Sequence, residues 1–197
     1  DWMATRDGKS LPKSYRIDRP WLPVPGKPFY LCAPVCVASG YGDFLAWSTD
    51  YFMGKYHFAG TYHDAGIPLH CDNPRHGCRK IDAFGRTART YNNLATREIY
   101  KRLYKIVHGH MPGGYLWVHT GLNRRPHIQS FFDIQMLGEE YMNVAPGNPN
   151  VYTDEKNALL KWQINYNSHI TGVPISFIGH SCPKNEDMAL PPKNIKR

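Results

Sequence analysis

Residues 90–120 read TYNNLATREIYKRLYKIVHGHMPGGYLWVHT, a helix pattern followed at once by a strand pattern. In residues 90–110 the apolar side chains fall near one helical face, and the charged side chains lie elsewhere. The sequence Met111-Pro112-Gly113-Gly114 ends this helix, and the apolar run 115–120 suits a strand. A helix that leads through a short turn into a strand is the repeating step of an α/β fold.

The same alternation continues on both sides of this stretch. Residues 43–56 and 154–170 have helical spacing, and residues 57–64, 128–133 and 173–178 suit strands. This order predicts an α/β fold with parallel strands, a partial or complete TIM-like (β/α) barrel. Residues 29–180 are expected to form the barrel portion. Residues 1–28 are expected to be an irregular Pro-rich segment, and residues 181–197 a polar, Pro-rich tail.

The composition excludes several classes of protein. Hydrophobic residues make up 42% of the 197 residues, which excludes a disordered chain. No run of about 18 apolar residues occurs, so no membrane span is predicted. The net charge is +8, but the basic residues are dispersed. A solvated basic surface is therefore favoured over a nucleic-acid site, and no nucleic-acid partner is expected.

The length bears on how the barrel is completed. A complete (β/α) barrel needs about 250 residues, more than the 197 present in this chain. We therefore expect a missing segment or another chain to complete it. The chain begins at Asp1 with no leader pattern, which fits a processed secreted or periplasmic protein and equally a piece of a longer one.

The predicted strands end in reactive side chains, and the carboxyl ends of parallel strands share one edge of the sheet. These residues are His63, Asp64, His119, Asp133 and His180. Glycoside hydrolysis needs two carboxyl groups, one a nucleophile or charge stabiliser and the other an acid. Asp64 and Asp133 are the predicted catalytic pair, and Glu139, which follows Asp133 in a loop, is the reserve acid.

Residues beside these acids are predicted to bind the substrate. His63, His119 and His180 offer hydrogen bonds to sugar hydroxyls. Tyr62 and Trp117 offer aromatic faces on which a sugar ring can stack, although core packing is an equally good explanation for them. A helix-capping role is the alternative for each Asp.

A cysteine-histidine loop, residues 70–78 (HCDNPRHGC), follows the strand 57–64. The side chains of His70, Cys71, His76 and Cys78 suit zinc, but their spacing is not that of a standard finger or ribbon. A disulfide between Cys71 and Cys78, or a structural loop clamp, is favoured over zinc. The chain has five cysteines, so one thiol stays unpaired if the others pair.

Several stretches resemble a group of uncharacterised bacterial glycoside-hydrolase-like proteins. They are 60–64 (GTYHD), 71–78 (CDNPRHGC), 97–104 (REIYKRLY), 118–120 (VHT), and 130–133 (SFFD) with 138–139 (GE). The resemblance spans roughly residues 36–179. Those proteins are similar to barrel glycosidases of the α-galactosidase type, in which a nucleophilic Asp ends the fourth strand and an acid Asp the sixth. By position, the resemblance implies Asp64 as nucleophile and Asp133 as acid/base.

These observations lead to one expected function and two alternatives. The expected function is hydrolysis of a glycosidic bond in an extracellular polysaccharide or oligosaccharide, in a secreted or periplasmic setting and with no cofactor. The first alternative is a non-catalytic carbohydrate-binding or matrix-forming protein on a degenerate barrel. The second is a metal-dependent hydrolase, which would need an ion held by three of His63, Asp64, His119 and His180.

Overall fold

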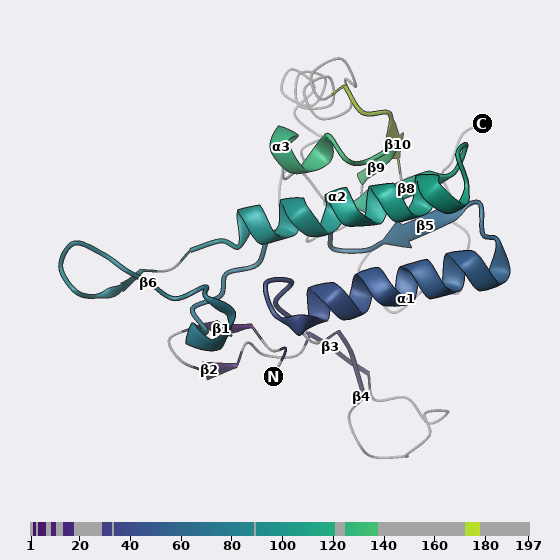
Figure 1. Cartoon of the computed structure of the whole chain (residues 1–197). Coiled ribbons are helices and arrows are strands. Elements are labelled where there is room, and N and C mark those ends of the chain that lie inside the picture. The colour runs from purple at the N-terminus through teal and green to yellow at the C-terminus, as the bar shows by residue number, and fades with distance from the viewer. Residues whose placement is uncertain are drawn as a thin grey trace, which may run out of the picture. The chain divides into compact units, whose positions relative to one another are not determined.

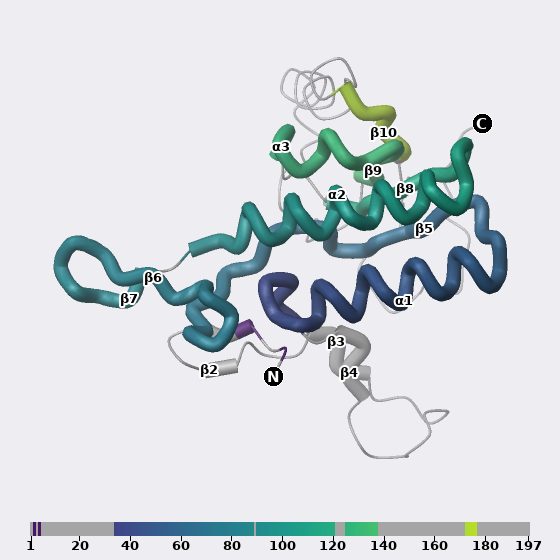
Figure 2. Tube along the Cα trace, viewed as in Figure 1, coloured from purple at the N-terminus to yellow at the C-terminus, as the bar shows by residue number. Residues whose placement is uncertain are grey.

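The fold was analysed in a computed structural model, which describes residues 2, 4–6, 9–10, 14–17, 29–32, 34–88, 90–120, 125–137 and 172–177. The chain divides into two compact units. The first comprises Asp1–His57 and Ile67–His110, and the second comprises Phe58–Gly66 and Met111–Arg197. Figure 1 labels their helices and strands, and Figure 2 traces the path of the chain through them.

The second unit contains a parallel sheet of four strands, whose order in space follows their order in the chain (Figure 1). The strands are β5 (Gly60–His63), β8 (Tyr115–His119), β9 (Ile134–Leu137) and β10 (Ile175–Phe177). Each pairs in parallel with the next. The predicted α/β fold with parallel strands is therefore confirmed. Sequential parallel order is also the order within a (β/α) barrel, but the described strands do not close into one.

The predicted strands 57–64, 115–120 and 173–178 correspond to β5, β8 and β10. The predicted strand 128–133 is wrong. Pro126–Gln129 forms a short helix, α3, and the strand β9 begins only at Ile134. Pro126 stands at the first turn of α3, where a missing amide N–H costs nothing. The buried side chains of Ile128 and Phe132 gave this turn the apolar pattern of a strand.

Two helices of the first unit, α1 (Gly40–Tyr56) and α2 (Asn93–His110), run side by side in the same direction (Figures 1 and 2). The Ser39 side chain caps α1 by accepting from the Tyr41 amide. Two side-chain contacts join the helices: the Arg102 guanidinium pairs with Asp43 at 2.7 Å, and Nε2 of His110 lies 2.7 Å from Oδ1 of Asp50. The predicted helices 43–56 and 90–110 are both confirmed.

The N-terminal part of the first unit is more regular than its prolines suggest. Within residues 1–28, predicted to be irregular, lie the short strands β1 (Thr5–Arg6), β2 (Lys9–Ser10) and β3 (Ser14–Ile17). β1 pairs with β2, and β3 pairs with β4 (Phe29–Cys32), both antiparallel. None of the strand residues is a proline, so their amides remain available to the ladders.

The loop 67–87 carries elements of its own. They are a turn of 3-10 helix, η1 (Pro74–His76), and an antiparallel pair, β6 (Lys80–Ile81) with β7 (Thr87–Ala88). Gly77 ends η1 in the left-handed conformation, with φ of 68°, which a residue with a Cβ adopts only at a cost. The chain therefore reverses sharply between His76 and Cys78.

Two predictions fall outside the described residues: the helix 154–170 and the tail 181–197. Among the described helices, none is both long and apolar enough to cross a membrane.

Candidate active site

The carboxyl edge of the parallel sheet holds a carboxylate–imidazole pair. Asp64 comes directly after β5, and His119 is the last residue of β8. The Asp64 Oδ1 atom lies 3.0 Å from Nδ1 of His119. A neighbouring pair of strands therefore brings together two residues that are 55 positions apart in the chain.

The turn after β5 fixes the position of this carboxylate. Oδ1 of Asp64 also accepts a hydrogen bond from the Ala65 amide at 2.8 Å. Ala65 has φ of 51°, a left-handed conformation that is unfavourable for a residue with a Cβ. The Gly66 amide then donates to the carbonyl oxygen of His119 at 2.8 Å. These bonds hold the turn against the end of β8.

The two members of the pair differ in exposure. The His119 side chain is 8% exposed, whereas that of Asp64 is 68% exposed. A hydrogen bond from Nδ1–H to the carboxylate would fix the imidazole ring and its tautomer. The buried histidine thus orients an acid that a ligand can reach from solvent.

Aromatic side chains lie on the same face of the sheet. Tyr62 and Trp117 are paired in register, and their rings meet edge to face with centroids 6.0 Å apart. Tyr62 is 49% exposed. The buried Nε1 of Trp117 has no hydrogen-bond partner within the part of the chain that the structure describes. Aromatic surface beside a few fixed polar groups is typical of small-ligand sites.

His63 belongs to the opposite face. Alternate residues of a strand point to opposite sides of a sheet, and the His63 ring lies 3.2 Å from the Thr61 hydroxyl on its own side. Burial lowers the pKa of His63 to about 4, so the ring is neutral at pH 7. The structure therefore does not bring His63 to Asp64 and His119, although the sequence grouped all three.

Asp133 lies at the other edge of the sheet. It precedes β9, and its Oδ2 atom accepts from the Leu116 amide at 2.8 Å, near the start of β8. The strand registers place Asp133 level with Leu116 and Asp64 level with His119, on opposite sides of β8. Three residues along the strands and two strand spacings separate their backbones by about 14 Å. Asp133 was expected at the end of a strand, but it directly precedes the start of one.

Carboxyl pairs of glycosidases are at most about 9.5 Å apart. The structure thus does not bring Asp133 into a pair with Asp64. Glu139 and His180 follow the last residues of β9 and β10 by two and three positions, and both lie outside the described residues.

Gln135 is level with Val118, so it shares the face of His63 and not that of the Asp64–His119 pair. Neither it nor its partner Thr120, both buried and polar, was predicted from the sequence. Gln135 is 1% exposed, and its amide group donates to the Thr120 hydroxyl. The Oε1 atom of Gln135 has no partner among the described residues. The sequence did carry a signal for this residue, because a glutamine stands between Ile134 and Met136 in an otherwise apolar strand. Burying a polar side chain costs stability unless it forms hydrogen bonds.

The cysteine-histidine loop lies in the first unit and differs from its predicted form. Cys71 and Cys78 are free thiols, as is Cys36, so the favoured disulfide between Cys71 and Cys78 is not formed. The reversal at Gly77 instead places Cys78 Sγ 3.5 Å from Cys36 Sγ. Cys36 was absent from the predicted group because it lies 34 positions before the loop begins.

The two histidines of this loop have different partners. His76 Nδ1 lies 3.7 Å from Cys71 Sγ. The ring of His70 instead lies tilted against that of Tyr91, with centroids 3.7 Å apart. Cys36, Cys71 and His76 are the one group of three metal-ligating side chains found among the described residues. Those residues include no such group at Asp64 and His119.

Comparisons of the chain with protein-family models, with curated proteins and with solved structures found no match.

Proposed function

We propose that the chain is part of a glycoside hydrolase whose active site is the carboxyl edge of the parallel sheet. The observation that carries the proposal is the pair of Asp64 and His119 beside the exposed ring of Tyr62. In parallel α/β folds this edge is where the reacting residues gather. The sequential strand order is compatible with a (β/α) barrel, and we propose that another segment or chain supplies the remaining strands.

In this proposal Asp64 places its negative charge against the sugar ring. Cleavage of a glycosidic bond passes through an oxocarbenium-like transition state, which a carboxylate stabilises. His119 is a positioning residue, because it holds the Asp64 carboxylate without being exposed itself. Tyr62 offers the surface on which the sugar stacks.

A second carboxyl group must protonate the leaving oxygen as the bond breaks. We assign this role to Glu139 in place of Asp133. Asp133 lies at the amino edge of the sheet and is held there by the Leu116 amide. Glu139 comes two residues after β9 in the sequence, and the loop after a strand of this kind contributes to the carboxyl edge.

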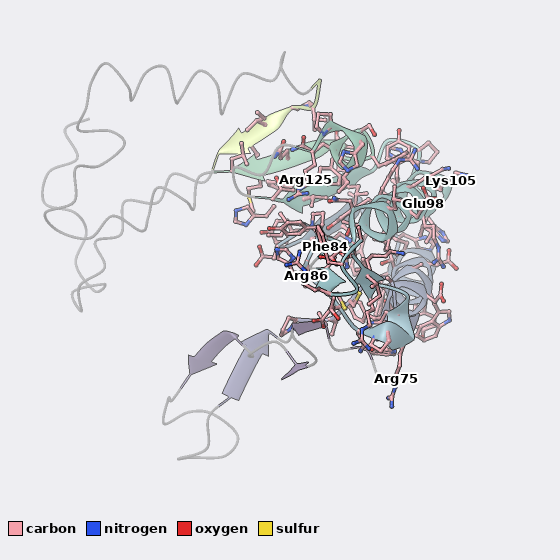
Figure 3. The ribbon with its side chains drawn as sticks, turned by 90° about the vertical axis from the view of Figure 1, so that its left-hand side faces the viewer. Arg75, Phe84, Arg86, Glu98, Lys105 and Arg125 are labelled. Atoms are coloured by element: carbon pink, nitrogen blue, oxygen red, sulfur yellow. The ribbon has the colours of Figure 1, made fainter. Side chains whose placement is uncertain are left out.

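The charge of the described residues favours an uncharged sugar. Arg125 is the only Lys or Arg among the described residues of the second unit. The described basic residues of the first unit include Arg75, Arg86 and Lys105, whose side chains project from the ribbon in Figure 3. Because the described residues of the second unit carry so few of the basic side chains behind the net charge of +8, we propose a neutral polysaccharide or oligosaccharide, in a secreted or periplasmic setting.

The second candidate function is non-catalytic carbohydrate binding. The distance between Asp133 and Asp64 favours it, because the pair first expected to catalyse is not assembled. An aromatic face with an ordered Asp–His pair suffices to bind a sugar without cleaving it.

A digestion screen with matched variants tests the proposal. The wild-type chain and the variants Asp64→Asn, Glu139→Gln and Asp133→Asn are incubated with neutral glycans, and released reducing ends are measured. We expect cleavage by the wild type, and a loss of at least about a hundredfold in Asp64→Asn and Glu139→Gln. Asp133→Asn keeps an oxygen for the Leu116 amide, so its activity should stay within about threefold of wild type.

Cleavage that survives in Asp64→Asn would rule out the assigned site. Binding of a glycan by every variant with no cleavage by any would favour the second candidate. If only Asp133→Asn lost activity, the general acid would be Asp133, at the amino edge of the sheet, and not Glu139.

A further inference from the structure

Three free cysteines and a histidine converge in the first unit. Cys36 Sγ and Cys78 Sγ are 3.5 Å apart, and Cys71 Sγ and His76 Nδ1 are 3.7 Å apart. The ligand atoms of Cys36, Cys71 and His76 all lie within 4.8 Å of one another. We propose that Cys36, Cys71, His76 and Cys78 bind one zinc ion.

The separations within two pairs of these atoms are close to those in a tetrahedral zinc site. Cys78 lies outside the group of three whose ligand atoms are all within 4.8 Å of one another, so its thiol must move closer to ligate the ion. Zinc lies about 2.3 Å from a thiolate sulfur and about 2.0–2.1 Å from an imidazole nitrogen. Ligands at the corners of a tetrahedron with these bonds are roughly 3.8 Å apart for two sulfurs and roughly 3.5 Å apart for sulfur and nitrogen. The observed separations of 3.5 Å and 3.7 Å differ from these by a few tenths of an ångström.

The same separations are not those of a disulfide. Bonded sulfurs are about 2.0 Å apart, whereas Cys36 Sγ and Cys78 Sγ are 3.5 Å apart. A single disulfide would also leave the third thiol and the imidazole without a role. A closed set of three thiolates and one imidazole leaves no position for a substrate, which is the pattern of structural zinc.

The surroundings hold the ligands in place. Asn92, directly before α2, donates from its side chain to Cys36 Sγ at 3.4 Å and accepts from the Leu69 amide at 2.9 Å. The Asn73 side chain lies 3.4 Å from Nε2, the far nitrogen of the His76 ring. Partners of this kind orient metal ligands. Arg75 points away from the loop into solvent (Figure 3) and does not place a cation against the thiols.

The packing shows what an ion would stabilise. The buried cluster here consists of Ala4 and the three cysteines, with Ala38 packed against it. Backbone bonds join the N-terminal segment to it, from the Ala4 amide to Pro34 O at 3.0 Å and from the Cys36 amide to Trp2 O at 2.8 Å. So few apolar atoms give little hydrophobic stabilisation, and small cores commonly depend on a metal or a disulfide.

Burial raises the pKa of the Cys36 and Cys78 thiols, and it is the largest cause that lowers the pKa of the His76 imidazole. Zinc would displace the thiol protons as it binds, so its affinity should fall on acidification.

The test measures zinc in the purified 197-residue chain. We expect about one equivalent of zinc to remain after dialysis against buffer without metal. Cobalt substitution should give the d–d bands of a tetrahedral site and a thiolate-to-cobalt charge-transfer band. The cobalt spectrum uses the unaltered chain, so it remains informative if a ligand variant fails to fold.

Variants separate this ligand set from its rivals. Cys36→Ser should lower zinc affinity at least tenfold, whereas Cys182→Ser and His70→Gln should retain the wild-type stoichiometry. The proposal is overturned if the wild type holds no zinc after incubation with it. It is equally overturned if non-reducing peptide mapping finds Cys36 joined to Cys78, or if His70→Gln loses zinc and Cys36→Ser does not.

Discussion

Adjacent histidine and aspartate residues at the end of β5 have opposite surroundings. Asp64 is exposed and bonded to His119, while burial lowers the pKa of His63 to about 4. The sequence predicted that this dipeptide ends a strand, and that was correct. The different exposures of the two residues could not be predicted, because they depend on which face of the strand is covered.

The pH dependence of stability should report on His63. The unfolded chain binds a proton at this histidine near pH 6.5, whereas the folded chain binds it only near pH 4. Acidification from pH 7 to 4.5 therefore favours unfolding, by up to roughly 2 kcal/mol from this group. In His63→Gln, urea unfolding should show a correspondingly smaller loss between these two pH values. An equal loss in both proteins would assign the pH dependence to other groups.

At the scale of elements, amphipathic patterns predicted the helices correctly, whereas a short apolar run led to a wrongly predicted strand. The helix 90–110 was predicted because its charged residues alternate with an apolar face, and α2 occupies Asn93–His110. Residues 128–133 were predicted as a strand because turns and strands both bury apolar side chains such as Ile128 and Phe132. Because this one strand was misplaced, Asp133 was predicted at the carboxyl edge of the sheet, whereas it lies at the amino edge.

The pairing of β5 with β8 depends on Gly60. A Cβ at this position would lie 2.1 Å from Tyr115 O and 2.7 Å from Tyr115 N, both backbone atoms that cannot move aside alone. Gly60→Ala should therefore lower the free energy of unfolding by at least about 2 kcal/mol. Gly113→Ala is the matched control, because a Cβ there meets nothing within 4 Å. Denaturant unfolding followed by tryptophan fluorescence measures both, and equal effects would contradict the close approach of the strands.

At the scale of the whole molecule, the alternation of helices and strands predicted the parallel sheet. The sequence also predicted that Asp64 and His119 share one edge of the sheet, and they meet there although 55 positions separate them. It did not predict that Cys36 lies beside Cys78, in a loop that begins 34 residues later. Such a contact depends on the path by which the chain folds back on itself, and local sequence patterns do not encode that path.

The central claim is that a glycan binds at the carboxyl edge of the sheet. Hydrogen–deuterium exchange of the Asp64→Asn chain, with and without a glycan found by the screen, tests it most directly, since this variant should bind without cleaving. We expect the glycan to slow exchange in peptides covering residues 60–66 and 115–120, and to leave residues 130–134 unchanged. Slower exchange confined to residues 130–134, or none anywhere at saturating glycan, would contradict the claim.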